Sequence, residues 1–420
     1  MRGLEPWLLS RGGVRLGNDF IRRLGEKYLM KNYTRQPVAL VKGEGVHVWD
    51  AEGNKYMDFV GGLAVNSLGH CDPEVVESAV EQLKKLIHCS NLYWTEPQVE
   101  LAQLLVENSD FDRVFFCNSG AEANEAAFKL ARRYFQVLKG SRRYKIITMY
   151  KSFHGRTLAA AAATGQEKVH TGFDPLPPGF VHVPFNDIEA LEKAVDDETC
   201  AVMLEPIQGE GGINAAKKEY MKEVERICRE NGILLMVDEI QCGMGRTGKL
   251  FAYEHYEIKP HVVTLAKALG GGLPIGAVLA VEEVSRAFGP GSHGSTFGGN
   301  PVSCAAGAAV VNALFERGLI KNAAQMGSYL YEKLEDLKEK YGFIEEVRGL
   351  GLMLGMELSM DGSRIVDLCR KRGLLINCAS EKVLRFLPPL NITREHVDRA
   401  VEILDEVLDS ISKEGEDGIG

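Results

Sequence analysis

The sequence predicts an α/β protein whose larger domain has three layers, with a mostly parallel sheet in the middle. Between residues 113 and 281, short apolar runs rich in β-branched and aromatic residues alternate with helical patterns. Several of these runs are apolar on both faces, as strands covered by helices on both sides must be. The expected strands are RVFFC, KIITMY, FVHVPF, CAVMLEPI, ILLMVDEI, HVVTLA and AVLAV.

Helices flank this region on both sides. DPEVVESAVEQLKKLIH is expected to form a helix with Asp72 as its N-cap and proline in the first turn. Three more helices are expected over 301–317, 321–340 and 393–411. The short runs GLMLGMEL, LLINC and VLRFL are predicted to be strands between them.

A chain of 420 residues exceeds what one core comfortably holds, so a second, smaller domain is expected. The mixed helices and strands near the C-terminus predict an α+β domain over 321–420. Residues 1–75, with a strand pair in ALVKGEGVHVWDAEGNKYMDF, are predicted to join it. The large domain would then span 76–320.

Composition and charge exclude several classes of protein. The net charge of −9, with no block of consecutive basic residues, argues against a nucleic-acid or anionic membrane partner. The nine cysteines are scattered without a C-x-x-C pair, so neither a disulfide framework nor a metal site is expected, and a reducing cytoplasm fits best. No apolar run reaches the length of about 18 residues that a membrane span needs, and no signal peptide is recognised.

The segment GMGRTGKL, residues 243–250, imitates two nucleotide-binding motifs. It matches G-x-G-x-x-G and nearly matches a P-loop, but the preceding strand ends in Asp238 and Glu239, whose charges repel a pyrophosphate. Leu250 stands where a P-loop needs the hydroxyl that binds Mg²⁺. We therefore interpret this segment as a glycine-rich loop that crosses the surface.

A better anion site is predicted in VFFCNSGAEANEAAFKLARRY. A strand runs through Ser119, Gly120 and Ala121 directly into an amphipathic helix, and small residues let backbone amides approach a phosphate at the positive end of that helix. Ser119 and Glu122 also match a capping box, and the two interpretations are compatible.

Two ionisable side chains are predicted at the ends of neighbouring buried strands. Asp238 ends ILLMVDEI, and Lys267 ends HVVTLAK. A buried charge needs a partner, and a direct ion pair between these two side chains would satisfy both. Pyridoxal phosphate explains more, because its aldehyde suits Lys267, its ring nitrogen suits Asp238, and its phosphate suits the amides of Gly120 and Ala121.

Further motifs accompany these residues in a fixed order: CNSGAEANEAAFKLAR, SFHGRT, EPIQGEGG, DEIQCGMGRTG, LAKALGGGLPIGA, GSTFGGNP and VLRFLPPL. In this order, from about residue 30 to 410, the chain resembles the class III, or ornithine-type, aminotransferases of fold type I. The resemblance implies a pyridoxal-phosphate-dependent transferase. The N-terminal stretch QPVALVKGEGVHVWDAEGNKYMDFVGGLAVNSLGH is similar to that of members acting on N-acetylornithine.

The resemblance also implies roles for individual side chains around the cofactor. Lys267 would bind it covalently and then move protons, and Asp238 would keep its ring nitrogen protonated. Phe153 would stack on the ring, and Gln241 would lie near the ring hydroxyl. Thr296 would reach the phosphate of a neighbouring subunit, with Ser295 beside the substrate. The family is thus expected to work as a homodimer with active sites at the interface.

Two anionic substrates must share one site in a transaminase. The resemblance assigns Arg156 to the α-carboxylate of acetylornithine and Arg385 to that of glutamate, since guanidinium pairs with both oxygens of a carboxylate. Glu210 would pair with Arg385 when glutamate is absent, and Glu205 would support this network. Glutamate would yield 2-oxoglutarate, and the aminated cofactor would aminate N-acetylglutamate 5-semialdehyde, with ping-pong kinetics.

One position bears on the choice of amino donor. Ornithine aminotransferases of this family carry a tyrosine, in the stretch corresponding to VGGLAVN, that meets the free α-amine of ornithine. Gly62 stands there in this chain, which favours an acylated amine. A sister activity on ornithine, succinylornithine, succinyl-diaminopimelate or 4-aminobutyrate remains the alternative.

Overall fold

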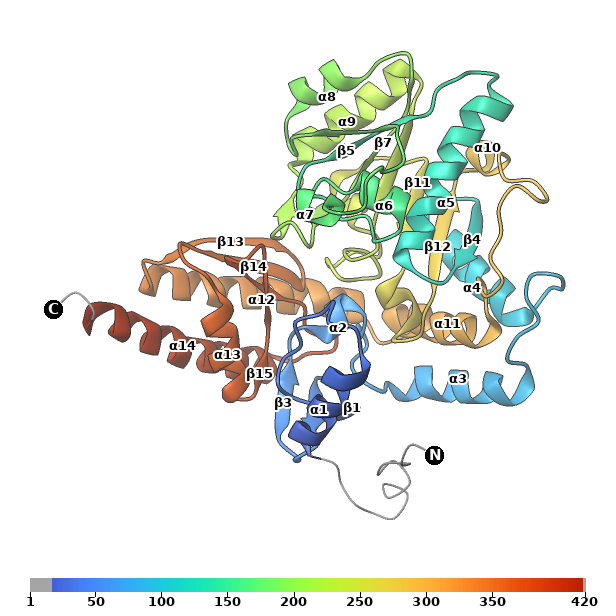
Figure 1. Ribbon diagram of the computed structural model, residues 1–420. Helices are drawn as coiled ribbons and strands as arrows, with labels where there is room; N and C mark the ends of the chain where they lie inside the picture. Colours follow the sequence, from blue (N-terminus) through green and yellow to red (C-terminus); the bar gives the residue numbers. More distant parts are fainter. Residues whose placement is uncertain (1–16, 418–420) are drawn as a thin grey trace.

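The computed structural model describes residues 17–417, and its centre is a seven-stranded sheet (Figure 1). All seven strands predicted between residues 113 and 281 belong to this sheet. β12 runs antiparallel to both neighbours, and the other pairs are parallel. In spatial order the strands are β4 (Arg113–Cys117), β12 (Gly276–Ala280), β11 (Val262–Leu265), β10 (Leu234–Asp238), β7 (Thr199–Leu204), β5 (Lys145–Met149) and β6 (Phe180–Val183).

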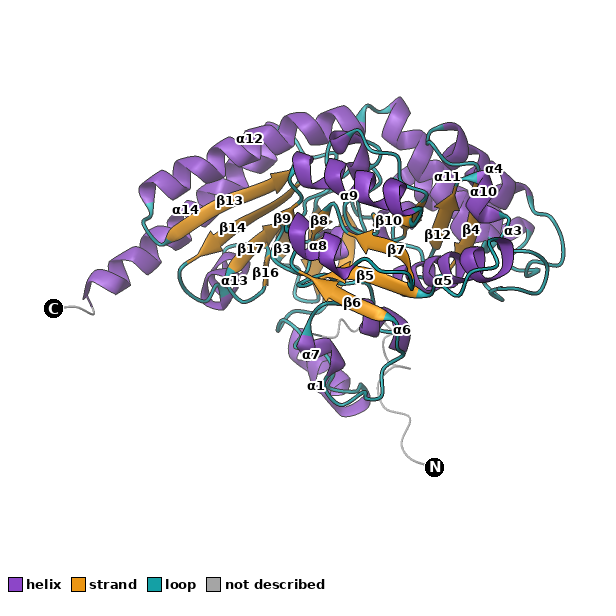
Figure 2. Ribbon diagram, turned by 90° about the horizontal axis from the view of Figure 1, so that it is seen from above, coloured by secondary structure: helices purple, strands orange, loops and turns teal. Residues whose placement is uncertain are grey.

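Helices cover both faces of this sheet, as the doubly apolar strands predict (Figure 2). In β10, Leu234 and Met236 pack into one buried cluster, and Leu235 and Val237 pack into the cluster on the opposite face. One face is covered by α5 (Gly120–Arg133), α6 (Leu158–Ala163) and α10 (Glu282–Ser285). The other is covered by α4 (Glu96–Glu107), α8 (Ile188–Ala194), α9 (Lys218–Asn231) and α11 (Pro301–Glu316).

The N-terminal and C-terminal segments pair with each other beside the large sheet. The expected N-terminal strand pair is divided into three strands, and β15, from the C-terminal region, adds to them in parallel with β3. A second four-stranded sheet is antiparallel throughout and includes a strand that the sequence analysis missed, β13. These strands are β1 (Leu40–Glu44), β2 (His47–Asp50), β3 (Lys55–Asp58), β15 (Leu374–Leu375), β13 (Ile344–Leu350), β14 (Met353–Leu358), β17 (Val383–Phe386) and β16 (Asn377–Ala379).

The predicted flanking helices are confirmed with small shifts at their ends. Asp72 caps α3 (Pro73–Lys85) by accepting a hydrogen bond from the Glu74 amide at 3.2 Å. The remaining elements are α1 (Asn18–Tyr28), α2 (Gly61–Ala64), α7 (Glu167–His170), α12 (Leu319–Lys340), α13 (Ser363–Lys371), α14 (Arg394–Asp417), β8 (Ile207–Gln208) and β9 (Asn214–Ala215). The domain limits at residues 75 and 320 stay a prediction, and residues 1–16 lie outside the described part.

The glycine-rich loop 243–250 is the main correction to the predicted fold. It does not cross the surface, because most of its residues are buried between the large sheet and the C-terminal sheet. Gly245 and Gly248 have φ angles of +85° and +88°, a region that favours glycine, and a Cβ on Gly248 would lie 2.8 Å from that of Ala324. The glycine spacing therefore serves close packing.

Within residues 17–417, no single helix is long and apolar enough to cross a membrane. The pair formed by α11 and α12, bent by 66°, meets the criterion by length and composition alone.

Candidate active site

A cavity of about 430 Å³ lies at the carboxyl ends of β10 and β11, where ligands bind in α/β sheets. It draws its lining from segments that are far apart in the sequence. Of the thirteen predicted site residues, nine line this cavity: Gly120, Ala121, Phe153, Arg156, Glu205, Glu210, Asp238, Gln241 and Lys267.

Lys267 opens a tight 3₁₀ turn, Lys267–Gly270, directly after β11. Its φ of +45° is unusual for a residue with a Cβ, and such strain tends to be kept where a side chain must point in one direction. Burial lowers the pKa of its amine, although the nearby carboxylate of Glu210 opposes this shift. Among residues 17–417 no ion pair joins Lys267 to Asp238, so the interpretation as a simple Asp–Lys pair is wrong.

Asp238 is instead held by hydrogen bonds from Asn124, His154 and the Ile240 amide. Asp238 is 3% exposed, and its Oδ2 accepts hydrogen bonds from Asn124 Nδ2 and His154 Nδ1, both at 2.8 Å. Oδ1 accepts one from the Ile240 amide at 3.0 Å. An ionised carboxylate accepts about four hydrogen bonds, so Oδ1 retains room for a donor in the cavity. A protonated ring nitrogen fits this position in charge and in hydrogen-bonding capacity.

The N-terminus of α5 forms another wall of the cavity. Ser119 caps the helix by accepting from the Glu122 amide at 3.2 Å, while the Glu122 carboxylate accepts from the Asn118 amide at 2.6 Å. The predicted capping box is therefore half formed, with the return bond shifted by one residue. The amides of Gly120 and Ala121, in the first helical turn, have no intrahelical carbonyl to bind and lie at the cavity. They fit the phosphate of the cofactor.

Phe153, Arg156 and Glu205 lie together on one side of the cavity. The guanidinium carbon of Arg156 is 5.5 Å from the centre of the Phe153 ring, and Arg156 is otherwise exposed. Glu205 accepts a hydrogen bond from the Phe153 amide at 3.0 Å. Burial and the negative charge of Asp238 raise the pKa of Glu205 well above its usual range. A protonated Glu205 can donate a hydrogen bond into the cavity.

Arg385 lies behind the cavity wall and reaches it through Glu210. Its Nη1 is 2.6 Å from Glu210 Oε1 and 2.9 Å from the Gly209 carbonyl, and its side chain is 2% exposed. Gln241 Nε2 also donates to Glu210 Oε1 at 3.2 Å. Burial raises the pKa of Glu210, but the attraction of Arg385 and Lys267 outweighs it and holds the pKa below its usual value. Glu210 is therefore ionised and forms an ion pair with Arg385.

Three predicted site residues lie away from the cavity lining: Gly62, Ser295 and Thr296. Gly62 is exposed, in the turn that leads to the cavity residue Val65. Ser295 Oγ accepts from Asn118 Nδ2 at 3.1 Å, so it is tied to the segment before α5. Thr296 is exposed. One chain thus does not bring these residues to its own cavity.

Four residues of the site had no role in the sequence analysis: Asn118, Asn124, His154 and Thr264. Asn124 donates to Asp238 and to the His154 carbonyl, and its own oxygen accepts from Thr264 Oγ1 at 2.8 Å. Asn124 is fully buried on the sheet-facing side of α5. A polar residue on the apolar face of a helix is a signal that could have found it, since a buried amide needs partners.

A family model described as aminotransferase class-III matches residues 28–408. The chain belongs to the class III aminotransferases. Membership confirms the predicted family and, with it, a transaminase that depends on pyridoxal phosphate. The cavity residues of this class III chain include an amine, an acid and a helix N-terminus that suit the three reactive parts of that cofactor.

Curated relatives and solved structures agree with this assignment. The acetylornithine aminotransferase of Caldanaerobacter subterraneus subsp. tengcongensis is 58% identical, over 92% of this chain and 98% of that relative. That of Methanocaldococcus jannaschii is 54% identical, over 93% and 98%. The ornithine aminotransferase of Toxoplasma gondii superposes with a TM-score of 0.93 at 33% identity, over 98% of this chain and 100% of that one. The acetylornithine aminotransferase of Elizabethkingia anophelis gives 0.85 at 34%, over 94% and 100%. The predicted fold class is thereby confirmed.

Proposed function

We propose that this enzyme transfers the terminal amino group of N2-acetylornithine to 2-oxoglutarate, reversibly and with ping-pong kinetics, as a step of arginine biosynthesis. The observation that carries the proposal is the sequence identity of 58% and 54% to two acetylornithine aminotransferases over more than nine-tenths of the chain. Ornithine aminotransferases superpose closely but at only 33% identity. They leave ornithine and the other sister substrates as the alternative.

The cavity assigns a task to each group that faces it. When bound, pyridoxal phosphate supplies an aldehyde for the amine and a protonated ring that takes up electrons from the reacting carbon. The Lys267 amine, with its pKa lowered by burial, can gain and lose a proton near neutral pH more easily than an exposed lysine. The carboxylate of Asp238 would face the ring nitrogen, Phe153 would stack on the ring, and Gln241 would lie near the ring hydroxyl.

The two arginines divide the anionic substrates between them. Exposed Arg156 at the cavity wall binds the α-carboxylate of acetylornithine, and Arg385 binds that of glutamate after Glu210 moves away. Glu205, which accepts a hydrogen bond from the Phe153 amide, supports this network from the cavity lining. Gly62, which lies outside the lining of this chain's own cavity, provides no hydroxyl for a free α-amine.

Replacing Glu210 by glutamine is expected to separate the two half-reactions. Arg385 then keeps an unpaired buried charge whenever glutamate is absent, so the acetylornithine half-reaction should slow by at least about tenfold. The glutamate half-reaction should change by less than about threefold, because the substrate carboxylate supplies the missing charge. Single-turnover absorbance measurements follow each half-reaction. Glu189→Gln, on an 81% exposed side chain, is the matched control. Equal slowing of both half-reactions would contradict the proposed switch.

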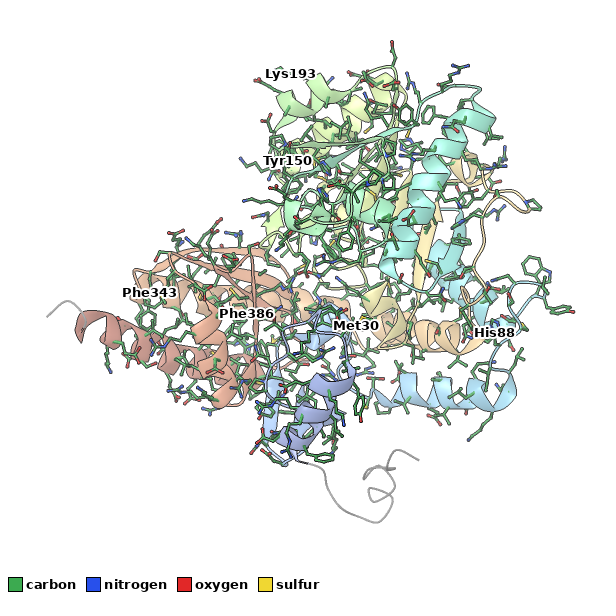
Figure 3. All side chains as sticks on the ribbon, viewed as in Figure 1. Met30, His88, Tyr150, Lys193, Phe343 and Phe386 are labelled. Atoms are coloured by element: carbon green, nitrogen blue, oxygen red, sulfur yellow. The ribbon has the colours of Figure 1, made fainter. Side chains whose placement is uncertain are left out.

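A homodimer would complete the site with Thr296 and Ser295 of a second copy. Support comes from large apolar side chains exposed near Thr296, namely Leu92, Tyr93, Trp94 and Phe297, of which Trp94 is 91% exposed. The centre of the Phe297 ring lies 4.9 Å from that of the His88 ring. His88, which is labelled in Figure 3, follows the end of α3 by three residues. Such a patch is typical of a protein interface.

All nine cysteines lie in the described part and are free, which supports a reducing, cytoplasmic location.

A panel of amino donors tests the proposed substrate. We expect kcat/KM for acetylornithine to exceed that for ornithine by at least about 30-fold, because a free α-ammonium without a partner costs about 2 kcal/mol. Succinylornithine and 4-aminobutyrate complete the panel, with glutamate formation as the readout. Equal efficiency with ornithine would refute the proposal and favour the sister activity.

A further inference from the structure

The loop GMGRTGKL contains a buried cation that the proposed function leaves unused. Arg246 is 1% exposed. Its Nη1 donates to the backbone oxygens of Leu352, at 3.0 Å, and of Pro388, and its Nη2 donates to Ser67 Oγ at 3.2 Å. In the described part of the chain, no carboxylate pairs with it. A buried guanidinium held only by neutral oxygens is costly to desolvate.

The three acceptors belong to segments that line the cavity or carry Arg385 behind its wall. Leu352 directly precedes β14, and Pro388 follows the end of β17 by two residues. These strands are neighbours, with Gly355 opposite Arg385. Ser67 follows the cavity residue Val65 by two positions. One guanidinium therefore joins the strand that carries Arg385, the strand beside it, and the segment that carries Val65.

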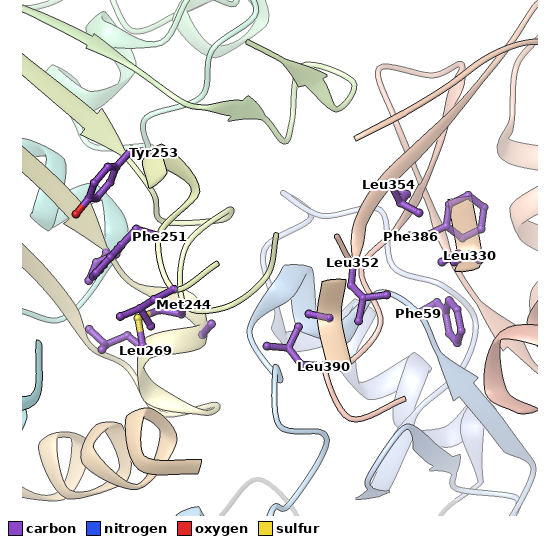
Figure 4. Close-up of a cluster of buried hydrophobic side chains, with 14 of the residues drawn as sticks. Phe59, Met244, Phe251, Tyr253, Leu269, Leu330, Leu352, Leu354, Phe386 and Leu390 are labelled. Atoms are coloured by element: carbon purple, nitrogen blue, oxygen red, sulfur yellow. The ribbon is translucent and has the colours of Figure 1, made fainter. Parts of the chain in front are cut away.

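Arg246 also belongs to the loop that follows Asp238 and Gln241. Its carbonyl accepts from the Leu352 amide at 3.0 Å, so the contact with Leu352 is made in both directions. Gly351 packs so tightly on this loop that a Cβ there would lie 2.5 Å from the backbone of Thr247. Figure 4 shows Met244 of the loop, Leu352 and Leu390 as members of one buried cluster. The loop cannot shift without moving these segments.

We infer that Arg246 is a positioning residue for substrate recognition: it fixes the end of β17 against the loop after β10 and so holds Arg385 in register with the cavity. The inference rests on the proposed binding of a substrate carboxylate by Arg385. The contact with Gln241 shows this alignment of Arg385 with the cavity, because Gln241 Oε1 accepts from Arg385 Nη1 at 3.4 Å. Lys267 and Asp238 are fixed by β11, β10 and α5, so they are independent of Arg246.

An experiment can separate an effect of Arg246 on Arg385 from an effect on Lys267 and Asp238. In Arg246→Met holoenzyme, three buried acceptors lose their donor, and the KM for 2-oxoglutarate should rise at least about tenfold. Arg246→Lys keeps the charge but cannot reach all three acceptors, so its KM should lie between that of the wild type and that of Arg246→Met. In both variants kcat should change by less than about threefold, and the absorbance spectrum of the bound cofactor should match the wild type.

Controls separate this role from general stability. Arg143→Met removes an arginine that likewise donates to two backbone oxygens, of Asn231 and Gly232, away from the cavity, and should leave KM unchanged. If Arg246→Met does not fold, Ser67→Ala removes one acceptor and should raise KM more modestly. A wild-type KM in folded Arg246 variants, or a fall in kcat with an altered spectrum, would overturn the inference.

Arg385→Lys distinguishes failure of this inference from failure of the proposed function. If Arg385→Lys raises the KM for 2-oxoglutarate and the Arg246 variants do not, the inference alone is wrong. If Arg385→Lys also leaves KM unchanged, Arg385 does not bind the carboxylate, and the proposed role of both arginines falls.

Discussion

Replacing Lys267 by alanine is expected to abolish both half-reactions, with a loss of at least about 10⁴-fold in turnover. The amine is the only lysine nitrogen among the cavity-lining side chains of the described chain. No neighbouring group can both attach to the cofactor and move a proton on the reacting carbon, since Arg156 does not deprotonate in proteins and the imidazole of His154 has no primary amine to attach to an aldehyde. Single-turnover absorbance with acetylornithine and with glutamate measures the loss.

A second readout identifies the residue independently of activity. Borohydride treatment of the wild-type holoenzyme should link the cofactor irreversibly to the peptide that contains Lys267, and peptide mapping should find no label in Lys267→Ala. Lys193→Ala removes a lysine whose side chain is 79% exposed and should behave as the wild type. Label on any other lysine would show that the cavity has been assigned wrongly.

Replacing Asp238 by asparagine is expected to lower turnover by about 10³-fold while leaving the fold intact. The amide has the same shape and keeps an oxygen for the Asn124 and His154 donors, but its NH2 group cannot accept from the Ile240 amide as Oδ1 does, and it carries no charge to hold a proton on the ring nitrogen. Loss of about 4 kcal/mol of charge stabilisation corresponds to this factor. Rates of the two half-reactions and the unfolding temperature provide the measurements.

The matched control is Asp187→Asn, which alters the N-cap of α8 outside the cavity lining. It should change stability by less than about 0.5 kcal/mol and leave activity unchanged, because asparagine caps a helix about as well as aspartate. The Asp238 variant should also bind pyridoxal phosphate more weakly, and a cofactor analogue with a permanently charged ring nitrogen should restore part of its rate. Full activity in Asp238→Asn would mean that the ring nitrogen is not the partner of this carboxylate.

Much of the fold was predictable because its pattern is local. Runs that are apolar on both faces favour strands between two helical layers, and all seven predicted strands form the large sheet. β13 was missed because IEEVRGL has charged residues on its exposed face and little apolar alternation. The loop around Arg246 was placed at the surface because glycine and charge are typical of surfaces. Its burial depends on Leu352, Pro388 and Ser67, which are distant in sequence.

The sequence by itself determined that Lys267 and Asp238 meet at one edge of the large sheet. Lys267 and Asp238 end neighbouring parallel strands, and strand ends meet at one edge of a sheet whatever surrounds them. Only the tertiary structure decided how their charges are satisfied. Asp238 is held by Asn124 and His154 rather than by Lys267, whereas the pair between Arg385 and Glu210 was already expected from the family resemblance. Hydrogen bonds and ion pairs act over a few ångströms, so they depend on packing between segments that a linear pattern does not order.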